Sequence, residues 1–285
     1  MFTRVVVFAS PQEVADTVAH KFLERVVDLL GSRDEVQVCL TGGGTADLVY
    51  ERFADLAAEA KLDLGRLHLW WGDERFVAAT DPDRNSLQAL SRLGRTLPIQ
   101  SARIHMMAAR DGRADPHDCA SEYAAELGDT HFDLTFLGMG PDGHVASIFP
   151  GHPSFDATSR AVIGVTESPK PPSERISLTI PTLNRSDEIW FIVTGTGKAD
   201  ALLRVLEGDE SPPLMPTGNK PPIGSSTRRS PRSCLRDTSA RSDAFKTLPT
   251  EPQGWVAELN RNRPRPHSWR STPAMSHSLA PAAQT

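Results

Sequence analysis

The fold is decided by the stretch Phe132-Asp133-Leu134-Thr135-Phe136-Leu137, which runs directly into Gly138-Met139-Gly140-Pro141-Asp142-Gly143-His144. The first six residues have the apolar character of a buried strand. The three glycines allow φ > 0 and a close approach of the backbone to a ligand. Because aspartate and histidine exchange protons near neutral pH, the loop predicts chemistry at the end of a strand. A lone histidine on a glycine turn is more often a surface residue, so the rest of the chain has to support this interpretation.

Two further loops have the same character and also follow strand-like runs. Thr41-Gly42-Gly43-Gly44-Thr45 lies between an apolar run and a helical pattern. The free N–H groups and the dipole of a helix N-terminus hold phosphate, although a triple glycine is equally typical of a tight turn. Trp71-Gly72-Asp73-Glu74-Arg75 ends another apolar run. There Arg75 could grip an anion and Asp73 could bind sugar hydroxyls, with a solvated charge cluster as the alternative.

Strand-like and helix-like segments alternate up to about residue 206. We expect strands at 4–8, 36–40, 67–71, 132–137, 161–165, 175–180 and 188–193, and helices at 11–30, 45–60, 86–93, 119–127 and 197–206. This alternation predicts an α/β fold, with a mainly parallel, doubly wound, Rossmann-like sheet and helices on both faces. In such folds ligands bind beyond the carboxyl ends of the strands, where all three loops lie.

Composition excludes several classes of protein. The 285 residues are 39% hydrophobic and 24% charged, and no apolar run reaches the ~18 residues of a membrane span. The N-terminal apolar run meets Ser10-Pro11 too soon for a signal peptide. The three cysteines form no CxxC pair. We therefore expect a cytoplasmic protein that needs no metal and no cofactor.

The end of the chain differs from the rest in its charge and its proline content. Residues 214–285 carry 11 Lys and Arg against 4 Asp and Glu and hold 10 of the 23 prolines, although the whole chain has a net charge of −5. This composition predicts an α/β domain at 1–213 and a disordered tail at 214–285. A frameshift near residues 212–215 is a second explanation of the tail. Because the tail lacks interleaved aromatics and a compact basic stripe, we expect no nucleic-acid partner.

Taken together, the motifs resemble the 6-phosphogluconolactonase family, in order and spacing, over roughly residues 4–213. The resemblance is carried by residues 41–45, 71–75, 85–86, 137–151, 168–172, 175–179, 193–195 and 198–199. The block 137–151 is the most specific of these. Beyond Pro213 the closing strand and helix of that family are not recognisable, which predicts an unpaired sheet edge.

The resemblance implies an activity and roles for the site residues. The implied reaction is metal-free hydrolysis of 6-phospho-D-glucono-1,5-lactone by a monomer of the oxidative pentose phosphate pathway. His144, held by Asp142, would act as general base on water. The implied substrate and phosphate contacts come from Thr41, Gly42, Gly43, Gly44, Thr45, Asp73, Arg75, Arg175 and Lys198.

Two alternatives stand beside this interpretation. Glucosamine-6-phosphate deaminases of the same superfamily share the glycine loop and the Asp-Gly-His turn. They continue into a Phe-Asn-Glu-Pro run whose Glu helps to open the sugar ring, whereas Phe149 stands in that place here. A non-catalytic sugar-phosphate-binding module would have no use for a base, so the presence of His144 counts against it.

Overall fold

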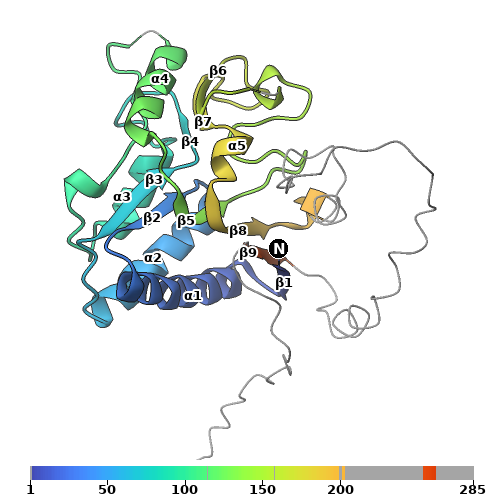
Figure 1. Cartoon of the computed structure of the whole chain (residues 1–285). Helices are drawn as coiled ribbons and strands as arrows, with labels where there is room; N and C mark the ends of the chain where they lie inside the picture. The colour runs from blue at the N-terminus through green and yellow to red at the C-terminus, as the bar shows by residue number, and fades with distance from the viewer. Residues whose placement is uncertain (1, 114, 157, 199–200, 203–252, 261–285) are drawn as a thin grey trace, which may run out of the picture.

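A six-stranded sheet forms the centre of the molecule (Figure 1). The computed structural model describes residues 2–113, 115–156, 158–198, 201–202 and 253–260. The strand order is β1-β9-β8-β5-β2-β3. The strands are β1 (Phe2–Phe8), β2 (Val36–Leu40), β3 (Leu67–Trp71), β5 (Phe132–Leu137), β8 (Ser186–Thr194) and β9 (Gly254–Asn260). Every pair from β8 to β3 is parallel, whereas β9 runs antiparallel to both of its neighbours. The mainly parallel sheet is therefore confirmed.

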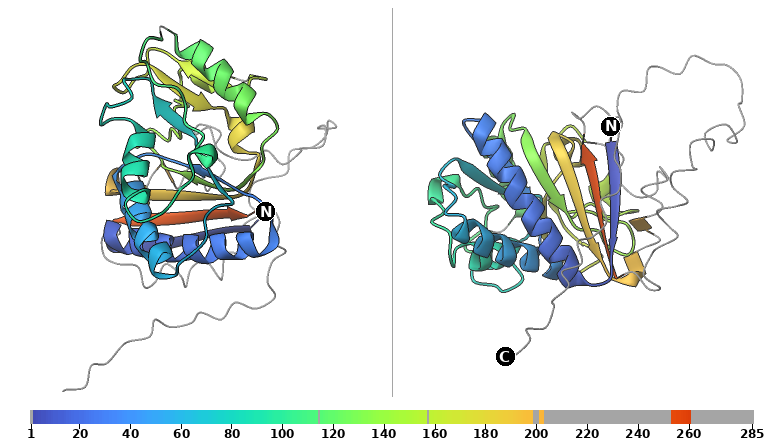
Figure 2. Two further views of the ribbon diagram at one scale, coloured as in Figure 1. Left: turned by 90° about the vertical axis from the view of Figure 1, so that its left-hand side faces the viewer. Right: turned by 90° about the horizontal axis from the view of Figure 1, so that it is seen from below.

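One face of this sheet is covered by helices (Figure 2). They are α1 (Pro11–Ser32), α2 (Gly44–Glu59) and α3 (Asn85–Leu93). Phe22 of α1 packs on Phe53 of α2 and edge-on against Phe136 of β5. α1 begins where the sequence predicts, because the Glu13 N–H donates to Ser10 Oγ at 3.2 Å and Glu13 Oε2 accepts the N–H of Ala9.

The other face carries α4 (Pro116–Leu127), α5 (Ile180–Leu183) and a small antiparallel sheet. The small sheet has the order β4-β7-β6, from β4 (Asp73–Arg75), β7 (Arg175–Leu178) and β6 (Val162–Val165). Strands near 161–165 and 175–180 were predicted from the sequence, but not their separation from the main sheet. The doubly wound α/β class is confirmed, with a small sheet beside α4 on a face where only helices were expected.

β9 corrects the expected domain boundary. Residues 254–260 pair with β1 on one side and with β8 on the other, and Val256 and Ala257 are buried. The prediction that the α/β domain ends at 213, with a missing strand beyond it, is therefore wrong for these seven residues. Their partners lie far away in the sequence, which local composition does not register. The predicted disorder and the frameshift concern 214–252 and 261–285, outside the described residues.

Candidate active site

The chain changes its winding direction between β2 and β5, and the loops leaving these strands line a cavity of about 300 Å³. β2 leads through α2 to β3 on one side, whereas β5 leads to β8 on the other. The two loops touch, because the Gly138 N–H donates to Thr41 Oγ1 at 3.3 Å. Doubly wound sheets bind their ligands at such a point. All three loops singled out in the sequence contribute residues to this cavity.

His144 lies in the wall of the cavity, on a tight turn after β5. The turn is closed by the Gly143 N–H, which donates to the Gly140 carbonyl, and by the Gly140 N–H, which donates to the His144 carbonyl. A Cβ on Gly140 would lie 2.2 Å from the His144 ring, so this position requires glycine. The His144 side chain is 17% exposed. Its ring lies 4.6 Å from that of the fully buried Phe149.

Asp142 fixes the tautomer of His144. The distance from Asp142 Oδ1 to His144 Nδ1 is 2.6 Å. An ionised carboxylate only accepts hydrogen bonds, so Nδ1 carries the proton and Nε2 keeps a free lone pair. Burial raises the pKa of Asp142, but the hydrogen bond and charge of His144 and the charge of Lys170 outweigh it and leave that pKa lowered.

His144 is held in its neutral form. Its pKa is lowered from the usual 6.5, first because burial disfavours the imidazolium and also because Lys170 is positive. The hydrogen bond and charge of Asp142 and the charge of Asp73 act in the opposite direction without overcoming burial. A neutral imidazole with a free Nε2 is a proton acceptor.

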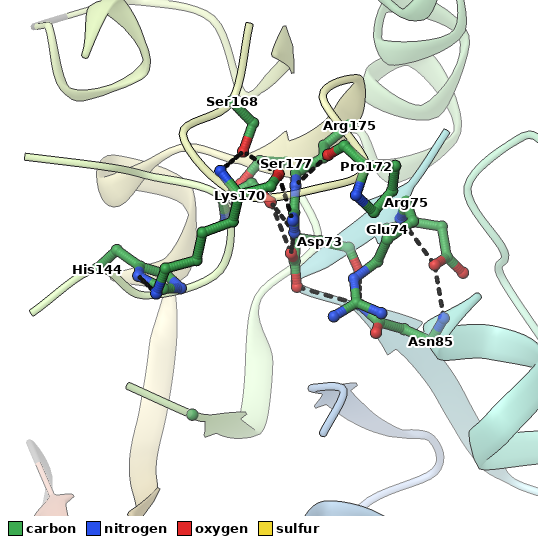
Figure 3. Close-up of polar contacts among 12 residues, drawn as sticks. Asp73, Glu74, Arg75, Asn85, His144, Ser168, Lys170, Pro172, Arg175 and Ser177 are labelled. Atoms are coloured by element: carbon green, nitrogen blue, oxygen red, sulfur yellow. Dashed lines mark hydrogen bonds and ion pairs between the residues drawn. The ribbon is translucent and has the colours of Figure 1, made fainter. Parts of the chain in front are cut away.

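Lys170 joins this pair from the loop between β6 and β7 (Figure 3). Its Nζ lies 3.4 Å from Asp142 Oδ1 and 3.2 Å from His144 Nδ1. Since the ammonium and the protonated Nδ1 are both donors, the hydrogen bond of Lys170 goes to the carboxylate. Lys170 was not among the predicted site residues. Its motif 168–172 was recognised, but nothing local shows that it folds back onto His144.

Three further cations line the cavity, which are Arg75, Arg175 and Lys198. Burial lowers the pKa of Arg175, and burial together with the charge of Lys170 lowers that of Lys198. Arg75 donates from NH1 to the Asp83 carbonyl at 2.5 Å, and its Nε has no partner among the described residues. Among the described lining residues the sole carboxylate is Asp73. The excess of positive charge favours an anionic ligand.

The glycine loop presents the start of α2 next to these cations. Gly43 is the N-cap of α2, and among the described residues no side chain caps this helix with a hydrogen bond. The N–H groups of this turn are therefore available to an anion. Gly42 cannot carry a side chain, since a Cβ would lie 1.9 Å from Asn85 Oδ1. Thr45 is not part of the cavity lining, and its hydroxyl is hydrogen-bonded to the Thr194 hydroxyl at 2.6 Å.

Asp73 contacts several residues in and behind the wall of the cavity. Its Oδ2 accepts from Ser147 Oγ at 2.7 Å and lies 4.0 Å from NH1 of Arg175 (Figure 3). Its backbone carbonyl accepts from Asn85 Nδ2 at 2.9 Å. The contacts with Arg175 and Asn85 hold two side chains of the cavity lining in place, so Asp73 both lines the cavity and positions other residues of its wall.

The neighbouring Glu74 has a structural task. It is fully buried and accepts the N–H groups of Asn85 and Ser86, at 2.7 and 2.9 Å, at the N-terminus of α3. It also pairs with Arg84 at 3.5 Å. A carboxylate at a helix N-terminus is favoured by the free amides and the helix dipole.

The structure brings most of the predicted site residues together. Those that line the cavity are Thr41, Gly42, Gly43, Asp73, Arg75, His144, Arg175 and Lys198. Asp142 stands behind His144, whereas Gly44 and Thr45 are not part of the lining. Lys170, Asn85 and Met139 line it as well and were missed, although each lies in a motif that carries the resemblance. The roles of these residues toward a substrate stay predictions.

The fold and the cavity together define a class of α/β enzyme with a cation-lined cavity at the switch point of the sheet and one histidine in the wall of that cavity. Comparison with known proteins gives the family. The family model described as glucosamine-6-phosphate isomerases/6-phosphogluconolactonase matches residues 9–222, and the chain belongs to this family.

Named relatives agree with this assignment. The chain is 41% identical to a 6-phosphogluconolactonase of Streptomyces coelicolor over 217 residues, which cover 72% of this chain and 83% of that protein. It is 39% identical to one of Mycobacterium tuberculosis, over 65% of this chain and 80% of the other. The crystal structure of a 6-phosphogluconolactonase from Thermotoga maritima is 30% identical, with a TM-score of 0.62, over 70% of this chain and 88% of that one.

The described residues contain neither a cluster of metal ligands nor a membrane-spanning helix. No group of three or more His, Cys, Asp or Glu side chains there could hold a metal ion. No helix in the described part of the chain is long and apolar enough to cross a membrane.

Proposed function

We propose that this protein hydrolyses 6-phospho-D-glucono-1,5-lactone to 6-phospho-D-gluconate in the oxidative pentose phosphate pathway. The proposal rests above all on one observation, a His144 whose Nδ1 is bound to Asp142 and whose Nε2 is left to accept a proton, in the wall of a cavity lined by four cations. The lactone carries a phosphate and an ester carbonyl, so its hydrolysis needs an anion site and a base within one cavity. The names of the relatives support the same substrate.

The reaction needs one proton acceptor and donors for an oxyanion. Nε2 of His144 takes a proton from water as the water oxygen attacks the lactone carbonyl carbon. The carbonyl oxygen becomes an oxyanion, which N–H donors stabilise by about 3–4 kcal/mol each where they are well placed. The carbon–oxygen bond of the ring then breaks, and the leaving oxygen takes the proton back from Nε2. The open-chain acid ionises and releases one proton to the medium.

The phosphate is assigned to the cations away from His144. Arg75 and Lys198 supply charged donors in the lining of the cavity, and the first turn of α2 supplies backbone donors at the glycine loop. Arg175 lies between this side and the base, because it borders Asp73 and also donates to the carbonyls of Lys170 and Pro171. We assign it to the sugar acid or to the oxyanion.

The alternative deaminase reaction lacks a free acid in the described site. The carboxylates at the cavity are Asp73 and Asp142, and both are engaged, with Ser147 and His144 respectively. Phe149, in place of the deaminase Glu, is fully buried against the His144 ring. Ring opening and amine transfer need an acid or base that these residues do not supply.

The test is a pH-stat assay with freshly made lactone, after subtraction of the uncatalysed rate. We expect proton release that depends on the protein, and no ammonia from glucosamine 6-phosphate. Ammonia release would favour the deaminase. Binding of 6-phosphogluconate without turnover would favour a non-catalytic sugar-phosphate-binding module. His144→Gln serves as the matched control for contaminating activity.

We further propose that the protein acts as a monomer in the cytoplasm, with a sugar phosphate as its ligand and no nucleic acid. A single species of about 31 kDa in light scattering supports the monomer. A stable dimer at assay concentration would contradict it.

A further inference from the structure

We propose that Lys170 is a positioning residue for the base: its ammonium group, held against the Asp142–His144 pair, adds to burial in favouring neutral His144 and keeps Asp142 as its hydrogen-bond acceptor. The proposal rests on the proposed function, in which His144 takes the proton of water. It assigns Lys170 a task that is separate from phosphate recognition.

The contact geometry carries the argument. Lys170 Nζ is within 3.2 Å of Nδ1 and within 3.4 Å of Asp142 Oδ1, so one cation borders both members of the pair. A proton arriving at Nε2 would create a second positive charge close to that ammonium, which the repulsion opposes. The positive charge of the same ammonium group stabilises the negative charge of Asp142 and thereby holds the carboxylate in its ionised form, which accepts hydrogen bonds.

The backbone of Lys170 is fixed from two sides. Its N–H donates to Ser168 Oγ at 3.3 Å, and its carbonyl accepts from Ser168 Oγ at 3.0 Å. The same carbonyl accepts from NH2 of Arg175 at 3.1 Å (Figure 3). Arg175 is itself buried and also donates to the Pro171 carbonyl. These hydrogen bonds fix the backbone of Lys170, so that its ammonium group is held next to Asp142 and His144.

The carboxylates around His144 act against its neutral form, and a nearby cation counteracts them. Asp142 and Asp73 both favour the imidazolium form. Arg175 lies 5.6 Å from the centre of the Phe149 ring, against which the His144 ring packs. Lys198 also lines the cavity, and its pKa is lowered by burial and by the charge of Lys170. Lys170 is the cation of the described site that touches the pair, and together with burial it offsets the two carboxylates.

The experiment is a proton NMR titration of the His144 ring in the free protein, which needs no turnover. Loss of one signal in His144→Gln assigns the resonance. We expect Lys170→Met to raise the pKa of His144 by about 0.5–1 unit, because a nearby positive charge is lost. Lys170→Arg keeps the charge and should keep the wild-type value. Lys170→Gln repeats the test if the methionine variant does not fold, with the remaining histidine signals as the folding control.

Kinetic measurements show whether the change in the His144 pKa also changes the pH dependence of the reaction. The acid limb of the kcat/KM profile should move to higher pH in Lys170→Met by the same amount, and Lys170→Arg should restore it. An unchanged His144 pKa in Lys170→Met overturns the proposal, and so does a rise in KM for the phosphorylated lactone without any movement of the pKa. Absence of lactonase activity in the wild type would refute the proposed function while the titration still reports on Lys170.

Discussion

Strand β9 should be essential for the stability of the domain. We compare a chain that ends at residue 252 with one that ends at residue 260, so that the difference isolates β9. β9 is an inner strand that pairs with β1 and β8, and Val256 is 1% exposed. Its removal exposes the inner edge of β8 and takes from β1 its only partner strand among those described.

The magnitude follows from these contacts. Burial of Val256 contributes about 1.5–3 kcal/mol and that of Ala257 about 0.8 kcal/mol. The ladder hydrogen bonds on both sides add about 1 kcal/mol each. The loss therefore exceeds about 5 kcal/mol, the same order as the whole stability of a typical domain, about 5–15 kcal/mol. For a domain of this size it corresponds to a fall in Tm of at least about 10–20 °C.

Thermal and urea unfolding followed by circular dichroism measure the difference. Two point variants refine it: Val256→Ala should cost about 2 kcal/mol, and Gln253→Ala, whose side chain is exposed, should change stability by less than about 0.5 kcal/mol. Equal urea midpoints for the two truncated chains would refute the reasoning, because β9 would then contribute nothing to the fold.

Further predictions concern the site. His144→Gln should lower kcat by about 10²–10⁴-fold while 6-phosphogluconate still binds in calorimetry, and unchanged turnover would remove His144 from the mechanism. Arg75→Ala should raise KM for the phosphorylated lactone much more than for gluconolactone, since a charge-assisted contact contributes about 1.5–3 kcal/mol; equal losses on both substrates would mean another role. Because the pKa of His144 is lowered and the neutral form is the base, kcat/KM should fall only below about pH 6.5, and a midpoint above that value would contradict the assignment.

Local signals were sufficient for the main elements of the fold. The capping residues Ser10 and Glu13 predicted the start of α1, and the apolar run of β5 with its glycine turn predicted the loop of the candidate site. These features depend on neighbours within a few positions along the chain. The positions of His144 and Asp142 could be predicted for the same reason, since they are two residues apart and one turn brings them together.

Contacts between distant segments could not be predicted. Asp73–Arg75 looks like a charged loop and becomes β4 only because β7 pairs with it about a hundred residues later. Lys170 reaches His144 because the loop after β6 folds back over the cavity. β9 was assigned to the tail because its flanking residues are rich in Arg and Pro, whereas its place in the sheet depends on partners that composition does not reveal.

The strand order β1-β9-β8 has a consequence for biosynthesis. Residues 2–8 leave the ribosome before every other strand of the sheet, but their partner strand at 254–260 is made about 250 residues later. At about 5–20 residues per second, β1 waits roughly 12–50 s during translation without that partner. An apolar strand without a partner is prone to pair with other chains. The newly made chain should therefore depend on chaperones most strongly in the interval before β9 emerges.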